Sequence, residues 1–353
     1  MSYFCVVKIH EKYLSRCIQL AKNGLGTTYP NPMVGSVIVH DGKIIGEGWH
    51  KKAGEAHAEV NAVHAVQDKS LLKEATIYVS LEPCSHFGKT PPCANLIIEH
   101  KIPKVVIGCI DSFSEVAGKG VEKLKQGGCE VILNVLESEC LTINKRFFTF
   151  HNKKRPYIIL KWAESADGFI APFIPNSKTS FAISNDYSRQ LVHKYRTEEQ
   201  AILVGTTTVL NDNPSLDARD WFGQHPTRII IDKSNKISDG FHVKNKKNPT
   251  IIFTEEENCV HSINIAYECI QFDTHLISNI LTHLFEKNIQ SVIIEGGTFT
   301  LQQFIDNHLW DEARVFISET KISEGVKRPK FNFIPEKTIK IKNNQLKTYI
   351  NYD

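Results

Sequence analysis

The sequence places a histidine, a glutamate and two cysteines in an order that suits a catalytic metal site. His57 and Glu59 are separated by one residue in AHAEV, and Cys84 and Cys93 stand at the two ends of CSHFGKTPPC. Imidazole nitrogen and thiolate sulfur are preferred ligands of zinc, and a catalytic zinc takes three protein ligands and keeps one position for water. We therefore predict a zinc site made of His57, Cys84 and Cys93.

Glu59 is the predicted proton carrier of this site and not a ligand. His-x-Glu followed by Pro-Cys is the pattern of zinc enzymes that remove an amino group from a nucleobase, although the gap between Cys84 and Cys93 is longer here. Zinc lowers the pKa of a bound water towards neutrality. A glutamate beside that water can take its proton and pass it to the ring nitrogen and then to the departing ammonia.

Two other interpretations are open at this point. His86 lies between the cysteines, and as a fourth ligand it would make a structural zinc site that has no need of Glu59. A nucleic-acid deaminase, such as a tRNA adenosine editor, fused to an unrelated domain would share the same pattern. Such a deaminase predicts a basic face, whereas the net charge here is only +3, so a catalytic zinc acting on a small molecule is favoured.

Alternating strand-like and helix-like segments surround these residues. Apolar spacing predicts a helix over 13–22, and VGSVIVHDGKIIGEGWH predicts two strands around a turn at Asp41-Gly42. A helix over 57–66 follows. The remaining predicted segments of this half are the strand ATIYVSLE, the helix CANLIIEHK, the strand KVVIGCI, the helix VEKLKQGG with its glycine stop, and the strand CEVILNV. This order predicts an α/β layered domain.

The length of 353 residues predicts two domains, which we place at 1–148 and 149–353. The basic segment 137–156 is the predicted linker, with its charges in solvent. The second half then restarts with YIILKWA and alternates strands and helices. One helix over 184–196 would be capped by Ser184 or Asn185, and EARVFIS, residues 312–318, is the predicted last strand.

The motifs PNPMVG (30–35), HAEV (57–60), LEPCSHFGKTPPC (81–93) and EGGTFTL (295–301) resemble the bifunctional deaminase/reductase of riboflavin biosynthesis. The resemblance runs from the first helix to about residue 320. It implies an α/β fold with an N-terminal cytidine-deaminase-like domain and a C-terminal dihydrofolate-reductase-like domain. It also implies Zn²⁺ and NADPH as cofactors, and a diaminopyrimidinone carrying a ribosylamino 5′-phosphate as the substrate.

The resemblance also implies substrate contacts in the first half. Asn31 would hold the pyrimidine through its amide, which donates and accepts hydrogen bonds, although a turn between two prolines is the alternative role. Lys89 and Thr90 would contact the phosphate, as a cation and a hydroxyl suit. His50 is a further candidate, which the end of a strand would explain equally well.

In the second half, Lys161 lies on an otherwise apolar predicted strand, so it needs a bound ligand or a carboxylate partner. Glycines and threonines at the ends of the strands AILVG and SVIIE suit a ligand at the edge of a sheet. The resemblance makes Lys161 the catalytic candidate. It implies substrate contacts from Ser180, Arg196, Leu216, Arg219 and Glu295, and cofactor contacts from Glu164, Thr208, Asp212 and Gly297.

The nicotinamide site departs from common patterns in two ways. No Gly-x-Gly-x-x-Gly fingerprint is present, so the cofactor must be held differently from a Rossmann dinucleotide. Where the family often has a tryptophan, this chain has Ala182 beside Phe181, which predicts a weaker cofactor contact unless Phe181 replaces it. We expect NADPH and not NADH, since no acidic ribose-binding residue is identifiable.

Composition restricts the partners and the compartment. No run reaches the roughly 18 apolar residues of a membrane span, and the N-terminus lacks the pattern of a signal peptide. Nine irregularly spaced cysteines predict reduced thiols. We therefore expect a cytoplasmic protein that binds neither nucleic acid nor membrane. The resemblance implies a small phosphorylated pyrimidine as its partner, and we also expect a homo-oligomer.

Overall fold

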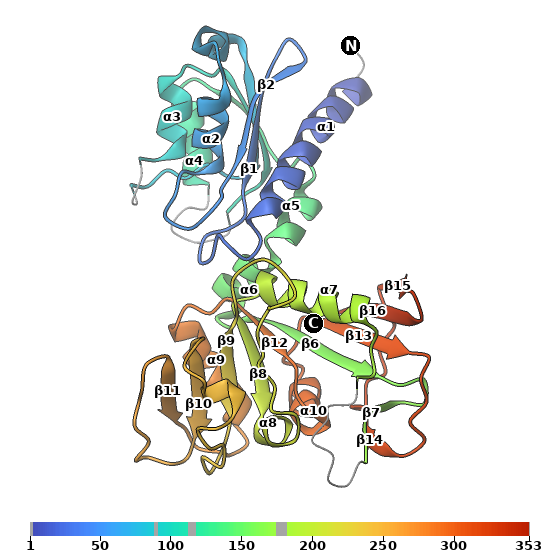
Figure 1. Ribbon diagram of the computed structural model, residues 1–353. Helices are drawn as coiled ribbons and strands as arrows, with labels where there is room; N and C mark the ends of the chain where they lie inside the picture. Colours follow the sequence, from blue (N-terminus) through green and yellow to red (C-terminus); the bar gives the residue numbers. More distant parts are fainter. Residues whose placement is uncertain (1–2, 88–90, 112–117, 174–181, 353) are drawn as a thin grey trace. The chain divides into compact units, whose positions relative to one another are not determined.

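The computed structural model describes residues 3–87, 91–111, 118–173 and 182–352. The chain forms two compact units, residues 1–153 and 154–353, which Figure 1 shows in blue to green and in green to red. Among the described residues, no helix is both long enough and apolar enough to cross a bilayer.

The first unit is built on a five-stranded sheet with the order β2-β1-β3-β4-β5. Its strands are β1 (Gly35–His40), β2 (Lys43–Trp49), β3 (Thr76–Leu81), β4 (Lys104–Cys109) and β5 (Glu130–Ile132). β1 is antiparallel to β2 and β3, and the pairs β3–β4 and β4–β5 are parallel. The turn between β1 and β2 has positive φ at Asp41 (48°) and Gly42 (72°), as a two-residue hairpin requires. The predicted hairpin is therefore confirmed.

Helices cover both faces of this sheet (Figure 1). α2 (Ala58–Ala65), α3 (Cys93–Glu99) and α4 (Lys119–Gln126) contribute to the hydrophobic core on one face. α1 (Tyr3–Ala21) and α5 (Glu137–Ile143) contribute to the core on the other face. The short 3-10 helices Lys22–Gly24 and Lys69–Glu74 complete the unit. The predicted α/β layers are confirmed.

Two glycines of β2 fix the position of α2. A Cβ atom on Gly46 would lie 2.4 Å from the carbonyl oxygen of Ala62, and one on Gly48 would lie 2.6 Å from Cβ of Asn61. Real Cβ atoms do not approach other atoms so closely, so any other residue would push the helix away. The GEG segment of the sequence therefore lets α2 lie directly on the backbone of the strand.

The predicted linker is wrong, because residues 137–153 form α5 and α6 (Lys145–Lys153). Cys140, Ile143 and Phe147 follow one another at the spacing of a helical stripe, and all three are buried in the core of the first unit. The basic residues that suggested a solvated segment alternate with this apolar stripe. Even Arg146 is buried.

Asn144, between α5 and α6, is tied to a loop 111 residues away. Its Oδ1 accepts a hydrogen bond of 2.8 Å from the backbone N–H of Met33, and its Nδ2 donates one of 2.9 Å to the Met33 carbonyl. The Asn144 side chain is buried. It therefore pairs with Met33 as a neighbouring strand would, and it holds the PNPMVG loop against the end of the unit.

The second unit is built on a nine-stranded sheet with the order β11-β10-β9-β8-β12-β6-β13-β16-β15. The strands from β11 to β13 are parallel, and β16 and β15 add an antiparallel edge. The bounds are β6 (Tyr157–Glu164), β8 (Ala201–Gly205), β9 (Thr227–Ile231), β10 (Thr250–Thr254), β11 (Ile265–Cys269), β12 (Ser291–Ile294), β13 (Glu312–Ser318), β15 (Lys337–Ile341) and β16 (Asn344–Ile350).

The other elements of this unit are a two-stranded sheet and helices. They are β7 (Phe169–Pro172), β14 (Gly325–Lys327), α7 (Asp186–Glu198), α8 (Thr206–Asp212), α9 (Leu276–Glu286), α10 (Thr298–Asp306) and the 3-10 helix His242–Lys244. Asn185 is the cap of α7, because its side chain accepts a hydrogen bond from the backbone N–H of Ser188.

The prediction that β13 is the last strand is wrong, since β14, β15 and β16 follow it. β15 is an edge strand whose residues are almost all exposed, so its lysines mask the apolar alternation by which a strand is recognised. β7 and β11 are further strands that the sequence reasoning missed.

The parallel sheet changes its direction of winding between β8 and β12. From β8 the chain passes through α8 to β9 on one side. From β12 it passes through α10 and across β6 to β13 on the other side. Open α/β sheets bind their ligands outside the carboxyl ends of the strands at such a point. The fold thus marks the ends of β8 and β12 as a ligand site.

We predict that Asn144→Ala destabilises the first unit by about 1–3 kcal/mol, because it leaves the N–H and C=O of Met33 buried without a partner. Native-state hydrogen exchange at the Met33 amide and denaturant unfolding would measure the loss. Thr142→Ala is a matched control, since its exposed hydroxyl bonds only within α5. If the Met33 amide in Asn144→Ala were as well protected from hydrogen exchange as in the wild type, the proposed role of Asn144 would be contradicted.

Candidate active sites

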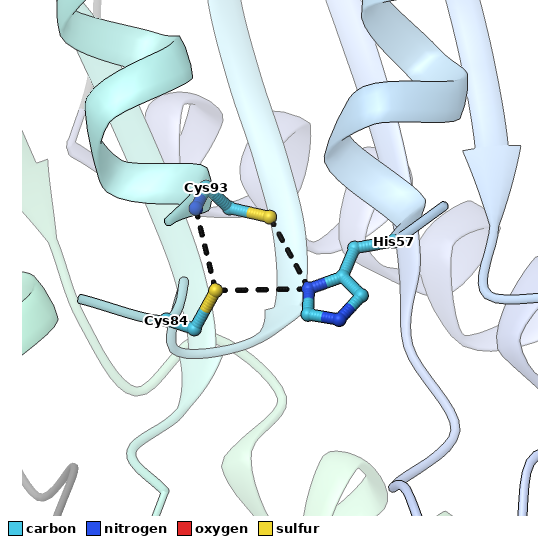
Figure 2. Close-up of side chains that lie close together, drawn as sticks. All are labelled: His57, Cys84 and Cys93. Atoms are coloured by element: carbon cyan, nitrogen blue, oxygen red, sulfur yellow. Dashed lines mark hydrogen bonds between the residues drawn. The ribbon is translucent and has the colours of Figure 1, made fainter. Parts of the chain in front are cut away.

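Three side chains from separate segments of the first unit converge at one point (Figure 2). His57 is the residue before α2, Cys93 is the first residue of α3, and Cys84 lies in the loop after β3. Nδ1 of His57 lies 3.6 Å from Sγ of Cys84 and 3.4 Å from Sγ of Cys93. The ligand atoms all lie within 4.8 Å of one another.

This geometry fits zinc. A tetrahedral zinc with ordinary bond lengths to sulfur and nitrogen sets those two ligand atoms roughly 3.6 Å apart, close to the distances given above. Contact with Cys93 and His57 lowers the pKa of the Cys84 thiol, which favours the thiolate that binds metals. The predicted ligands are thus brought together with the chemistry that zinc requires.

The described residues offer three ligands at this point and no fourth. His86 is exposed and does not belong to the group of converging ligand atoms. A structural zinc closed by four protein ligands is therefore not supported by the part of the chain that the structure describes. Three ligands with one position left for water is the arrangement of a catalytic zinc.

Glu59 lies in the first turn of α2 and is only 3% exposed. It is not one of the converging ligand atoms. Burial, with a smaller contribution from Cys84, raises the pKa of its carboxyl to about 7. A proton carrier works best when its pKa is close to the pH of the reaction, so the environment of Glu59 suits proton transfer beside the metal.

Asn31 and His50 lie together next to the ligand His57. The rings of His50 and His57 are 5.4 Å apart. Nδ1 of His50 lies 3.1 Å from the Ala56 carbonyl, which can only accept, so this nitrogen carries the hydrogen. Burial lowers the pKa of His50, and its free Nε2 accepts from Nδ2 of Asn31 at 3.1 Å. The Asn31 amide is thereby oriented with Oδ1 available to a ligand.

Four positions named from the sequence lie outside the described residues, namely Lys89, Thr90, Ser180 and Phe181. Ala182 is described and is exposed.

In the second unit, Lys161 has the carboxylate partner that the sequence requires. Nζ of Lys161 on β6 lies 3.4 Å from Oε2 of Glu295, which directly follows β12. Nη2 of Arg196, in the last turn of α7, donates to the same oxygen at 2.8 Å. Burial acts to raise the pKa of Glu295, but Arg196 and Lys161 lower it to about 2. The three form a buried network in which two cationic side chains favour the ionised form of the carboxylate.

The loop after α8 is tied to this network. Nη1 of Arg196 donates to the carbonyl of Asp217 at 2.9 Å. Leu216 is buried with a positive φ of 50°. Arg219 forms an ion pair with the Asp217 carboxylate, and more than half of its side chain is exposed. The structure thus holds Leu216 and Arg219 next to α7, with Arg219 at the surface.

Thr208 and Gly297, both named from the resemblance, meet where the winding of the sheet changes. Oγ1 of Thr208 on α8 accepts from the backbone N–H of Gly297, the residue before α10, at 3.0 Å. Asp212 ends α8, and burial raises the pKa of its carboxyl. Glu164 ends β6, where its carboxylate accepts from Trp162 Nε1 at 2.7 Å and lies 3.8 Å from Nε of Arg328.

Sequence reasoning missed several residues that support these sites. Asn144 holds the loop that carries Asn31, and Asp217 holds both arginines of the second site. Arg328, the residue directly after β14, forms an ion pair with Glu164. No local pattern could have found Asn144 or Arg328, because their partners are far away in the sequence, and the contact of Asp217 with Arg196 is made through the Asp217 backbone.

Two family descriptions match the chain. "Cytidine and deoxycytidylate deaminase zinc-binding region" matches residues 7–109, and "RibD C-terminal domain" matches residues 156–324. The first range includes all three converging ligands and Glu59, and the second includes the network of Lys161, Arg196 and Glu295. The predicted cytidine-deaminase-like and reductase folds are confirmed, and so is a zinc-dependent deaminase domain.

Similar proteins align with nearly the whole length of the chain. It is 40% identical to the riboflavin biosynthesis protein RibD of Aquifex aeolicus over 323 residues, which are 90% of this chain and 89% of that protein. A crystal structure of a diaminohydroxyphosphoribosylaminopyrimidine deaminase/5-amino-6-(5-phosphoribosylamino)uracil reductase from Thermotoga maritima has a TM-score of 0.86 and 37% identity, and covers 97% of this chain and 98% of its own. RibD of Acinetobacter baumannii has a TM-score of 0.87 and 30% identity, with 98% and 99% covered.

A nucleic-acid deaminase fused to an unrelated domain is not favoured, because the likeness to these relatives extends through both units. The chain belongs to the RibD family, the bifunctional deaminases and reductases of riboflavin biosynthesis.

Proposed function

We propose that the chain deaminates 2,5-diamino-6-ribosylamino-4(3H)-pyrimidinone 5′-phosphate and then reduces the ribosyl group of the product, 5-amino-6-(5-phosphoribosylamino)uracil. The observation that carries the first step is the convergence of His57, Cys84 and Cys93 within 4.8 Å beside the buried Glu59. The Thermotoga maritima relative is named for the same two activities. Incubation with the diaminopyrimidinone phosphate and NADPH, with ammonia release and nicotinamide oxidation followed separately, tests both steps.

We assign the deaminase to residues 1–148 and the reductase to residues 149–353. The two family descriptions, at 7–109 and 156–324, fall on either side of this boundary and support the assignment. Each unit has hydrophobic cores of its own, which supports two separable activities.

In the deaminase, Zn²⁺ held by His57, Cys84 and Cys93 would lower the pKa of a water towards neutrality. Glu59 takes a proton from the water, and the water oxygen bonds to the ring carbon that carries the amino group. Glu59 then gives that proton to the ring nitrogen. Glu59 next takes the remaining proton from the added hydroxyl group and gives it to the amino group as the carbon–nitrogen bond breaks. The hydroxyl thereby becomes a ring carbonyl, and ammonia leaves. The raised pKa of Glu59 supports both halves of this exchange.

Four residues would hold the substrate in the first site. Asn31 binds the pyrimidine, with its amide oriented by His50. Lys89 and Thr90 bind the 5′-phosphate through a cation and a hydroxyl.

In the reductase, bound NADPH would supply a hydride to C1 of the ribosyl group. As the new C–H bond forms, the ring C1–O bond breaks and its oxygen takes a proton, which leaves an open ribitylamino chain. Lys161 is the catalytic candidate, because its buried cation can orient the sugar and stabilise developing charge. The other residues assigned to the substrate are Ser180, Arg196, Leu216, Arg219 and Glu295.

We place the cofactor at the ends of β8 and β12, with contacts from Glu164, Thr208, Asp212 and Gly297. The bond between Thr208 and Gly297 at the change of winding supports this position. NADPH is the expected form of the cofactor. A kcat/KM with NADPH that is well above that with NADH checks this expectation, and an equal value with both would contradict it.

We also propose that the protein works in the cytoplasm as a homo-oligomer. The cysteines that the structure describes are free thiols, which agrees with a reducing compartment. Analytical ultracentrifugation would determine the number of subunits.

Glu59→Gln should keep zinc and lose deamination by about 10²–10⁴-fold, because Gln has the shape of Glu but cannot take up and release a proton. Zinc content by mass spectrometry and ammonia release measure the two effects. Ammonia release near the wild-type rate in the zinc-loaded variant would rule out the role of Glu59.

The two activities should be separable. Glu59→Gln should still oxidise NADPH when it is given the deaminated substrate, and Lys161→Ala should still release ammonia from the diaminopyrimidinone. Both half-reactions are assayed for both variants, after circular dichroism has shown that each is folded. If a folded variant lost both activities, the assignment of independent sites would be wrong.

A further inference from the structure

Glu82, the residue directly after β3, gathers four backbone N–H groups on one carboxylate. Oε1 accepts from Gly120 at 2.8 Å and from Val121 at 3.1 Å. Oε2 accepts from Gly118 at 3.1 Å and from Asp111 at 3.3 Å. The Glu82 side chain is buried, with 4% exposed. Since the first N–H groups of a helix have no partner within the helix, this carboxylate fixes where α4 begins.

The start of α4 in turn braces the segment that carries Cys84. A Cβ atom on Gly120 would lie 2.1 Å from the carbonyl oxygen of Pro83, so the first turn of α4 lies directly against the residue before the cysteine. Nζ of Lys123, one turn further on, lies 3.5 Å from the carbonyl oxygen of Ser85, the residue after it. α4 therefore contacts both neighbours of Cys84 in the chain.

Cys84 needs this support more than the other two ligands do. His57 is the cap residue of α2, and Cys93 begins α3, so their positions follow from those helices. Cys84 lies in a loop. Cys84 also contacts the start of α3. The backbone N–H of Cys93 donates to the Cys84 sulfur, and the backbone N–H of Ala94 donates to the Cys84 carbonyl. The thiol is thus held between α3 and α4.

We propose that Glu82 is a positioning residue of the zinc site, which sets the place of Cys84 by anchoring the start of α4. This inference rests on the proposed binding of zinc by His57, Cys84 and Cys93. Glu82 does not belong to the group of converging ligand atoms. Its carboxylate joins the end of the strand before Cys84 to the helix that braces this cysteine.

Glu82→Gln is the sharpest substitution, because it keeps the size of the side chain. Gln presents an –NH₂ group where a carboxylate oxygen accepted two N–H groups, so one pair of backbone donors then faces another donor. Substitution of residues that orient metal ligands typically costs about 10–100-fold in metal affinity. We expect a loss of this size in zinc affinity, measured by competition with a chromophoric chelator on the full-length protein.

A second readout reports the geometry directly. With Co²⁺ in place of zinc, Glu82→Gln should shift or weaken the thiolate-to-cobalt absorption, because the Cys84 sulfur is displaced. NADPH oxidation with the deaminated substrate should stay at the wild-type rate, since it depends on the second unit.

Tyr78→Phe is a matched control. Tyr78 lies on the same strand, and its hydroxyl makes a buried hydrogen bond of 3.0 Å to His10. It packs in the core on the face of the sheet away from α2, α3 and α4. This variant should lose stability but keep wild-type zinc affinity and the wild-type cobalt spectrum.

Wild-type zinc affinity and an unchanged cobalt spectrum in Glu82→Gln would overturn the proposal, even if deamination were lost. If that variant does not fold, Gly120→Ala decides, because it keeps the carboxylate but pushes α4 away from the Pro83 carbonyl, and it should weaken zinc binding as well. Zinc affinity at the wild-type level in folded Gly120→Ala would equally overturn it. Zinc titration of the wild-type protein separates the role of Glu82 from the proposed function. A wild-type chain that binds no zinc would contradict the proposed function itself.

Discussion

The zinc site depends on the close contact between the backbones of β2 and α2. Metal ligands must meet within a few tenths of an ångström of their required distances, yet His57 is separated from Cys84 and Cys93 by long stretches of chain. The sheet solves this by starting α2 and α3 at neighbouring places, with a ligand at or beside the first residue of each. Because Gly46 and Gly48 let α2 lie on the strand itself, the histidine is placed by backbone packing and not by flexible side chains.

The second unit is governed by a different constraint, the cost of burying charge. Lys161 lies on a strand in the middle of the sheet, where an unpaired cation would be unfavourable. Glu295 offsets that cost, and its position after β12 follows from the pairing of β12 with β6. Arg196 then gives the carboxylate a second cation from α7. With two cations on one carboxylate, the network keeps a net positive charge, which suits a phosphorylated substrate.

The sequence predicted what is local or is written in residue type. The hairpin at Asp41-Gly42 and the trio of metal ligands belong to this class, because turn chemistry and ligand preference are properties of short segments. Predictions from the sequence were wrong or absent where contacts between distant segments determine the local structure. Basic residues interrupt the stripe of Cys140, Ile143 and Phe147, so the sequence predicts a linker where the structure has α5 and α6. The bond between Asn144 and Met33 has no signature, since it joins residues 111 positions apart.

Two buried glutamates show how the same side chain is given opposite tasks. For Glu59, burial is the dominant influence and the pKa rises to about 7, so its carboxyl exchanges a proton readily at neutral pH. For Glu295, burial has the same direction, but Arg196 and Lys161 outweigh it and the pKa falls to about 2. Glu295 therefore stays ionised and can accept hydrogen bonds but cannot act as an acid near neutrality. A pKa near neutrality suits Glu59 to the proton transfer that we propose for it. Glu295 holds the two cations, Lys161 and Arg196, in place.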